Sequence, residues 1–376
     1  MIIYINGKFC AQRTTGTQRV AYSIISALDV LLTSRPIPNV RWVLLCPPTV
    51  SMAPRLNTIE VEQLGRLKLP LNFWEQVVLP LRTRGSLLIS LCGVAPFHKT
   101  CQLCIIHDTA IYDHPNAYAR VFTLSRRYLL KRLAKAAPLI PTVSGFSCDR
   151  LMHWLNLPRS RFRVVPNGAD HIHAIESDSE TPEILGLTGI RYLLTVASEN
   201  PTKNLRRLME AFAKSGVRDL RLVLVGGENR AVFSDSPAEA NSPLIIRTGF
   251  IDDPQLKWLY ENAEAFLFPS IYEGFGLPPL EAMVCGCPVV VSDIPSLREV
   301  CGDAALYFNP MDIESIQDAL VRISTDFSLR ALLIEQGYIR ASRYQWSQSA
   351  LGLLECVQYV IEGQMSERRG RADGVK

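Results

Sequence analysis

Short apolar runs alternate with helical runs twice along this chain of 376 residues, and this pattern limits its fold more than any other feature. The first series predicts strands at 1–6, 41–46, 58–64, 87–91, 102–107, 139–144 and 163–166. The second predicts strands at 192–196, 220–225, 244–248, 265–268, 288–292 and 305–308. Strands that alternate with helices form parallel sheets with crossover helices. We therefore predict an α/β protein with two Rossmann-like doubly wound domains that face a cleft.

The change of character after residue 170 sets the expected domain boundaries. Residues 1–170 form the predicted N-terminal domain, and 190–345 form the C-terminal one. Between them, 171–189 is acidic, contains Asp178-Ser179-Glu180-Thr181-Pro182, and predicts a linker. We expect a C-terminal helix over 346–364 that packs back on the N-terminal domain, and a flexible tail over 365–376.

Charge is distributed unevenly between the two halves. Residues 1–170 carry 21 Lys and Arg against 8 Asp and Glu, whereas 171–376 carry 19 against 28. The predicted helix over 120–135 and the segment Leu67–Arg82 mix basic with apolar side chains. This favours contact between the N-terminal half and an anionic membrane surface. A solvated basic face over a core stripe is the alternative.

Other features narrow the class of protein. No run of about 18–20 apolar residues predicts a membrane span, and the first residues do not resemble a signal peptide. We expect a cytoplasmic protein, peripheral on the inner face of the cell membrane. The ten cysteines lack the spacing of a zinc site, and no motif indicates nucleic-acid binding.

The segment Pro269–Met283 carries the strongest chemical signal. It follows a predicted strand and opens a helix, with Glu273 before that helix and Glu281 about one turn inside it. A Gly-x-Gly turn at a helix start presents free backbone amides to a phosphate, and a carboxylate suits two vicinal ribose hydroxyls. A surface turn with two solvated acids would have the same local pattern.

This segment resembles the E-x7-E signature of the family-4 retaining glycosyltransferases, which have the GT-B fold. The resemblance implies that Glu273 approaches the donor sugar and that Glu281 binds the ribose. It also places the backbone amides of Gly274, Phe275, Gly276 and Leu277 near the diphosphate.

Further segments resemble the family in the same order along the chain. Asn200-Pro201-Thr202-Lys203-Asn204 is similar to its Pro-x-Lys-Asn motif, which implies that Lys203 neutralises the diphosphate. Many members have an arginine about five residues earlier, where this chain has Ser198. The pair Gly226 and Gly227 resembles the nucleotide-side glycine turn, and Gly16 a glycine that faces the donor phosphate.

The N-terminal half supplies the predicted acceptor side. A histidine at the carboxyl end of a parallel strand can reach the cleft, and His107-Asp108 resembles the family's pair at the donor-sugar and acceptor pocket. Ser144 resembles a residue that lines the cleft. We expect His107, Asp108 and Ser144 to contact the acceptor, and His107, Glu273 and Lys203 to act in catalysis.

The resemblance implies transfer of a sugar, with retention, from a nucleoside diphosphate sugar to a hydroxyl of a glycan or polyprenyl-linked acceptor. GDP-mannose is the first choice of donor. No Asp-x-Asp motif follows a strand, so we expect no essential metal and no cofactor. The alternatives are a nucleotide-sugar epimerase and a catalytically silent protein that binds a nucleotide sugar and scaffolds a complex.

Overall fold

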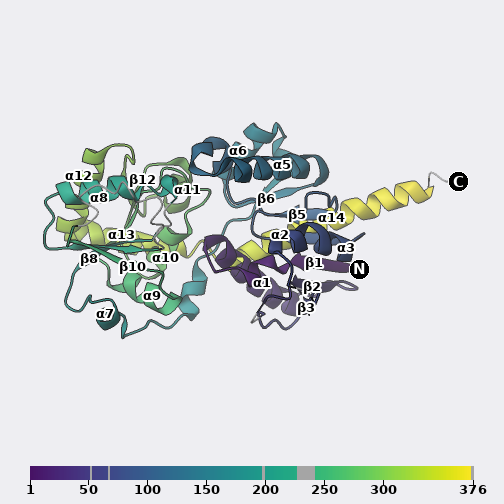
Figure 1. The fold of residues 1–376 in the computed structure, drawn as a ribbon, viewed down its shortest axis with the longest axis horizontal. Coiled ribbons are helices and arrows are strands. Elements are labelled where there is room, and N and C mark those ends of the chain that lie inside the picture. Colours follow the sequence, from purple (N-terminus) through teal and green to yellow (C-terminus); the bar gives the residue numbers. More distant parts are fainter. Residues whose placement is uncertain (51–52, 67, 197–199, 227–241, 374–376) are drawn as a thin grey trace. The chain divides into compact units, whose positions relative to one another are not determined.

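The computed structural model describes residues 1–376 except 51–52, 67, 197–199, 227–241 and 374–376. The chain divides into two compact units (Figure 1). The first comprises Met1–Gly168 and Trp346–Lys376, and the second comprises Ala169–Gln345. Each unit is built on its own parallel sheet.

The first unit contains a five-stranded sheet in the order β3-β2-β1-β4-β5. Its strands are β1 (Ile2–Asn6), β2 (Arg41–Cys46), β3 (Glu60–Gln63), β4 (Leu87–Ser90) and β5 (Gln102–Cys104). All their pairings are parallel. A parallel bridge between Ile106 and Thr142 links β5 to the smaller sheet of β6 (Ile140–Thr142) and β7 (Phe162–Val164). Strands β1, β2 and β4 are almost wholly buried, as expected of a sheet covered on both faces.

Helical segments connect these strands. They are η1 (Gly7–Ala11), α1 (Gly16–Ser34), α2 (Leu71–Phe73), η2 (Trp74–Val78), α3 (Leu79–Arg82), α4 (Ala110–Asp113), η3 (Pro115–Ala117), α5 (Arg120–Ala136), α6 (Gly145–Leu155) and η4 (Arg159–Arg161). Helix α1 buries an apolar stripe that includes Val20, Ile24 and Leu28, at the three-to-four-residue spacing of one helix face. The segment η2 is a π-helix that joins α2 to α3.

The last helix, α14 (Trp346–Asp373), belongs to the first unit, where it packs against α1 and β7. Small residues allow this close approach. A Cβ built on Gly352 would lie 3.5 Å from Val165 Cγ2, and the Ser349 hydroxyl donates to the Pro166 carbonyl oxygen. The helix extends beyond residue 364, where the sequence predicted its end.

The second unit contains a six-stranded parallel sheet in the order β10-β9-β8-β11-β12-β13. Its strands are β8 (Tyr192–Val196), β9 (Arg221–Val225), β10 (Ile245–Gly249), β11 (Ala265–Phe268), β12 (Val289–Ser292) and β13 (Leu306–Phe308). The chain first adds strands on one side of β8 and then returns to add β11 on the other. The crevice where this order reverses is the usual ligand site of a doubly wound sheet.

Helices cover this sheet. They are η5 (Asp170–Ala174), α7 (Thr181–Ile184), η6 (Pro201–Lys203), α8 (Leu205–Lys214), α9 (Asp253–Asn262), α10 (Leu277–Val284), α11 (Pro295–Cys301), α12 (Ile313–Thr325) and α13 (Phe327–Ala341). Side chains of α8 and α12, among them Phe212 and Leu320, form one core with Leu222, Leu267 and Val290 of the sheet. These three strand residues lie on one face, because side chains alternate along a strand.

The predicted α/β class, with two parallel doubly wound sheets, is confirmed. Residues 171–189 belong to the second unit, where they include η5 and α7. The first unit ends its leading segment at Gly168, two residues before the predicted boundary. Among the described residues, no helix combines the length and the hydropathy of a membrane span.

Candidate functional site

Lys203 and Glu273 meet at the carboxyl edge of the second sheet. Lys203 ends η6, which follows β8, and Glu273 lies in the loop that follows β11. These are the two strands between which the strand order reverses. Lys203 Nζ lies 2.6 Å from Glu273 Oε1, and the two side chains are 24% and 14% exposed. Both predicted groups therefore lie in the crevice where a doubly wound sheet binds its ligand.

Three further contacts hold this pair in place. The Ile271 N–H donates to the Thr202 carbonyl oxygen at 2.8 Å, which joins the loop after β11 to η6. The Asn200 side chain accepts from the Thr202 N–H at 3.0 Å and caps η6. Lys203 Nζ also lies 5.6 Å from the centre of the Phe268 ring. The ammonium group is thus positioned by a carboxylate and an aromatic face.

The start of α10 has few free amide groups. Leu277 is its first residue, and Pro278 and Pro279 follow, so only one of the first three residues has an N–H. Gly276 precedes the helix with φ +106°. Any phosphate at this site would be held by amides of the turn itself, Gly274 to Leu277, because the first helical turn contributes little.

Glu281 lies on α10, and its side chain is buried. Its Oε1 lies 3.2 Å from His171 Nε2 of η5, and its Oε2 accepts a hydrogen bond from the Tyr260 hydroxyl at 3.3 Å. The Tyr260 hydroxyl of α9 therefore orients the carboxylate, and the His171 ring of η5 lies beside it. The predicted contact of Glu281 with a ribose remains a proposal.

The predicted glycine turn after β9 is only partly described. The Gly226 N–H donates to the Gly249 carbonyl oxygen at 2.9 Å, so it continues the pairing of β9 with β10. This amide is not available to a phosphate in this structure. Gly227 lies outside the described residues, as does Ser198, which occupies the position of the family's arginine.

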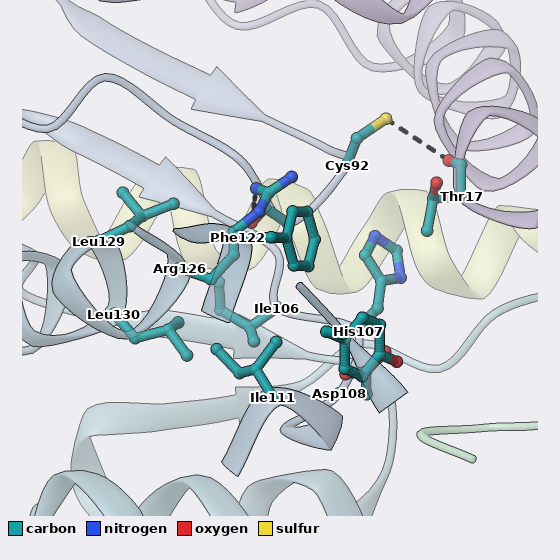
Figure 2. Close-up of a pocket in the computed structure, with 12 residues that line it drawn as sticks. Thr17, Cys92, Ile106, His107, Asp108, Ile111, Phe122, Arg126, Leu129 and Leu130 are labelled. Carbon is teal, nitrogen blue, oxygen red and sulfur yellow. Dashed lines mark hydrogen bonds between the residues drawn. The ribbon is translucent and has the colours of Figure 1, made fainter. Parts of the chain in front are cut away.

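The first unit has a cavity of about 140 Å³ at the carboxyl edge of its own sheet (Figure 2). His107 and Asp108 line it together with Thr17 at the start of α1. The wall also contains Cys92, Gly93, Ile106, Ile111, Tyr118, Phe122, Arg126, Leu129 and Leu130. The cavity combines mostly apolar walls with a few polar groups, as small-molecule sites do.

The position of His107 determines which ring nitrogen is available. His107 Nε2 lies 2.7 Å from the Leu91 carbonyl oxygen, which can only accept, so Nε2 carries the hydrogen. Burial lowers the pKa of His107 below its ordinary value. At neutral pH the ring is therefore uncharged, and Nδ1 holds the lone pair that can accept a hydrogen bond from a hydroxyl.

The other predicted residues of the first unit have different surroundings. Gly16 opens α1 and is exposed, and a Cβ built on it would meet no atom within 4 Å. Asp108 lines the cavity, and its Oδ1 accepts from the Ala110 N–H at 2.9 Å. Ser144 is buried, and its hydroxyl oxygen accepts from the Ser147 N–H at 2.9 Å to cap α6. In this structure Ser144 stabilises a helix start.

The basic face expected on residues 120–135 is smaller than predicted. Arg126, Arg127 and Arg132 are only partly exposed. They donate to the carbonyl oxygens of Gly93, Ile111 and Phe97 respectively. Tertiary packing turns these guanidinium groups toward the protein. Arg120, Lys131 and Lys135 remain exposed on α5.

Comparison with known proteins explains the arrangement in the second unit. Residues 178–340 match the family model described as glycosyl transferases group 1. This region contains Lys203, Glu273 and Glu281. Residues 178–340 therefore form a domain similar to the group 1 glycosyl transferases. These are the family-4 enzymes that the sequence motifs resemble.

Relatives of this chain include two mannosyltransferases of Escherichia coli. The chain is 31% identical to O-antigen chain mannosyltransferase B over 252 residues, which are 64% of this chain and 65% of that protein. It is 27% identical to the serotype-specific mannosyltransferase WbdA over 295 residues, which are 73% of this chain and 35% of WbdA. The matches thus cover less than two thirds of the length of either relative.

A solved structure shares the fold of this chain. Sucrose-phosphate synthase from Thermosynechococcus elongatus superposes with a TM-score of 0.75 at 18% sequence identity. The superposition covers 96% of this chain and 99% of that one. At this identity the likeness shows the GT-B fold alone.

Some residues that surround the predicted side chains in each unit were not predicted from the sequence. They are Tyr260 and His171, which contact Glu281, Phe268 beneath Lys203, and Arg126 in the cavity of the first unit. The spacing of Phe122 and Arg126, four residues apart on α5, was a signal for a shared helix face. No local pattern indicated His171 or Tyr260, because they reach Glu281 from elements distant in sequence.

Proposed function

We propose that this chain transfers a sugar from a nucleoside diphosphate to a hydroxyl acceptor, with the donor bound by the second unit. The observation that carries the proposal is the contact between Lys203 and Glu273 in the crevice of a group 1 glycosyl transferase domain. A lysine ammonium suits a phosphate as a point charge. The neighbouring carboxylate keeps that ammonium oriented and can accept a hydrogen bond from a sugar hydroxyl.

The chemistry requires stabilisation of the leaving diphosphate. The bond between the sugar C1 and the phosphate oxygen breaks, and C1 forms a bond with the acceptor oxygen on the same face. The acceptor proton passes to an oxygen of the departing phosphate. Negative charge thus develops on the diphosphate, where Lys203 and the amides of Gly274 to Leu277 stabilise it.

The acceptor binds in the cavity of the first unit. His107 Nδ1 accepts a hydrogen bond from a hydroxyl of the transferred sugar or the acceptor, and Asp108 lies next to it in the wall. Mannose from GDP-mannose is the first choice of donor, since both E. coli relatives are named mannosyltransferases. A glycan or polyprenyl-linked glycan of surface polysaccharide assembly is the corresponding acceptor.

A thermal-shift panel of GDP, UDP, dTDP and ADP, each with its common sugar conjugates, tests the donor site. We expect GDP and GDP-mannose to stabilise the protein selectively. At a concentration 100 times the Kd, the gain is about 2.7 kcal/mol, or roughly 5–10 °C in Tm. Glu281→Gln should abolish most of this shift, because an amide replaces the carboxylate that accepts from the ribose.

The matched control is Glu335→Gln, which removes an exposed carboxylate of α13 in the same unit and should retain the full shift. Selective stabilisation by UDP, dTDP or ADP would show that the donor carries that nucleotide instead of GDP. An absence of any shift at millimolar nucleotide, on folded protein, would contradict the donor site. Conversion of a nucleotide sugar without an acceptor would support the epimerase alternative instead.

We also propose that the first unit contacts an anionic membrane surface through the exposed apolar side of α5. Val121, Leu124 and Tyr128 are 81%, 66% and 47% exposed, and they lie on one helix face with the exposed Arg120 and Lys131. A second exposed apolar stripe follows α2 to α3 at four-residue spacing, with Phe73, Val77 and Leu81. Apolar side chains flanked by cations suit the interface of an anionic bilayer.

Sedimentation with vesicles of phosphatidylglycerol and of phosphatidylcholine tests this contact. We expect binding to the anionic vesicles only, weakened about tenfold by Leu124→Glu because a carboxylate is repelled and one apolar anchor is lost. Val30→Glu alters an equally exposed side chain, 67% exposed, on α1 and should bind as the wild type does. An equal loss of vesicle binding in both variants, or no binding of the wild type to either vesicle, would show that this face of α5 does not contact the membrane.

A further inference from the structure

Arg126 occupies an unusual position in the cavity of the first unit. It stands at the end of a stack with Tyr118 and Phe122, each four residues from the next. The Tyr118 and Phe122 rings are stacked with centres 5.6 Å apart, and Arg126 Cζ lies 4.9 Å from the centre of the Phe122 ring. Figure 2 shows the guanidinium beside this ring, in the wall that also holds His107. The stack therefore orients a cation in the cavity.

The hydrogen-bonding capacity of this guanidinium is mostly unused. Arg126 Nη1 donates to the Gly93 carbonyl oxygen over a long 3.4 Å. The adjacent Arg127 uses Nε and Nη2 together on the Ile111 carbonyl oxygen, at 3.1 and 2.9 Å. Guanidinium has five N–H donors in a planar fork. Arg127 serves the fold, whereas Arg126 keeps donors for another partner.

The acidic groups nearby are already engaged. Glu75 forms a buried ion pair with Lys8, with 2.7 Å between Nζ and Oε2. Asp108 accepts from the Ala110 N–H. His107 lies in the same wall and is neutral at pH 7, since burial lowers its pKa. Among the described residues, no carboxylate oxygen lies within 4.0 Å of the Arg126 guanidinium, which leaves a positive charge at the cavity without an ion-pair partner.

Such a charge is costly to keep. Burial lowers the pKa of Arg126, but arginine remains protonated at neutral pH, so the cation is retained at the expense of its hydration. A desolvated charge in a pocket is a feature of binding sites. The cavity exceeds by about tenfold the roughly 10–15 Å³ that a single water requires.

We propose that Arg126 binds an anionic group of the acceptor, a phosphate or a carboxylate, in this cavity. The planar fork of Arg126 suits two oxygens of such a group, and Phe122, Leu129 and Leu130 contact the apolar parts of the ligand. His107 lies in the same wall and directs the reacting hydroxyl. The inference rests on the proposed function, which makes this cavity the acceptor site, and it adds that the acceptor is charged.

Ligand-observed NMR titrations with mannose 6-phosphate, glucuronate and methyl α-mannoside test this inference. We expect the wild type to bind a charged sugar at least about tenfold more tightly than the neutral one, because hydrogen bonds to charged groups are the stronger ones. The preferred anion identifies the group as phosphate or carboxylate. Arg126→Gln should reduce binding of that sugar to the level of methyl α-mannoside, and Arg126→Lys should give an intermediate affinity.

Lys135→Gln is the matched control, since it removes an exposed cation from the same helix and should bind as the wild type does. Nucleotide binding, measured on the same variants, separates the two proposals. If nucleotides bind but Arg126→Gln keeps its preference for the anionic sugar, Arg126 is not the anion site. A second outcome is that no nucleotide binds, while Arg126→Gln no longer prefers the anionic sugar to the neutral one. This would support the anion site and contradict the proposed sugar transfer.

Discussion

Lys203→Met is expected to lower kcat and kcat/KM for sugar transfer by about 10²–10³-fold, the cost of removing one group that stabilises charge in a transition state. Lys203 is the cation that the structure places where the strand order of the second sheet reverses, 2.6 Å from Glu273. Methionine retains the length of the side chain and its contact with Phe268, but not the charge. Because the charge on the diphosphate grows as the sugar departs, the loss should fall on kcat as well as on binding.

Steady-state kinetics against a matched ion-pair variant measure this effect. Lys214 also pairs with a glutamate in the second unit, at 2.7 Å from Glu210, but it lies on the exposed side of α8 with a side chain 53% exposed. Lys214→Met should change kcat by less than about twofold, as expected of an exposed pair. If Lys203→Met, with an unchanged Tm, retained turnover within threefold of the wild type, Lys203 would not be the group that neutralises the diphosphate.

Gly276→Ala is expected to destabilise the second unit by about 2–5 kcal/mol. Two costs add at this position. The backbone has φ +106°, and a side chain in the left-handed region costs roughly 1–2 kcal/mol. A Cβ would also lie 2.5 Å from Leu297 Cδ2, in a buried position where overpacking costs about 1–3 kcal/mol. The shift of the turn would displace the amides of Gly274 to Leu277 and weaken nucleotide binding as well.

Denaturant unfolding of Gly276→Ala and Gly186→Ala separates these two costs. Gly186 also has a positive φ, +65°, but a Cβ there would meet no atom within 4 Å. Gly186→Ala should therefore show the backbone cost alone, roughly 1–2 kcal/mol, and leave nucleotide binding unchanged. Equal losses of stability in the two variants would mean that Leu297 moves aside freely and that the turn before α10 is not tightly packed.

Local sequence signals predicted most of the strands. The predicted strands at 41–46, 192–196 and 265–268 coincide with β2, β8 and β11, because β-branched and aromatic residues form short runs bounded by turn residues. The run from Pro269 to Met283 also indicated a loop followed by a helix. Helix α6 was not predicted, since its start was interpreted through the resemblance of Ser144 to a cleft residue rather than as a helix cap.

The sequence predicted only part of the candidate site. Lys203 and Glu273 were both identified, but their ion pair joins residues 70 positions apart. Glu281 was identified as well, but its neighbours His171 and Tyr260, which lie beside its buried carboxylate, were not. Gly226 was expected to serve the nucleotide, but its amide pairs with Gly249. In each case a partner distant in sequence decides the role of the group.

The sequence by itself determined the two doubly wound sheets and the motif that contains Lys203, Glu273 and Glu281. Periodicity, turn chemistry and motif spacing are local properties, so they can be recognised in a short segment without knowing which residues pack against it. The tertiary structure alone decided which arginines of α5 face the solvent and which single one, Arg126, retains donors inside a cavity. A long charged side chain turns inward only where polar partners compensate the cost of desolvating it. For the arginines of α5 these partners come from the loop between β4 and β5 and from α4, outside the helix itself.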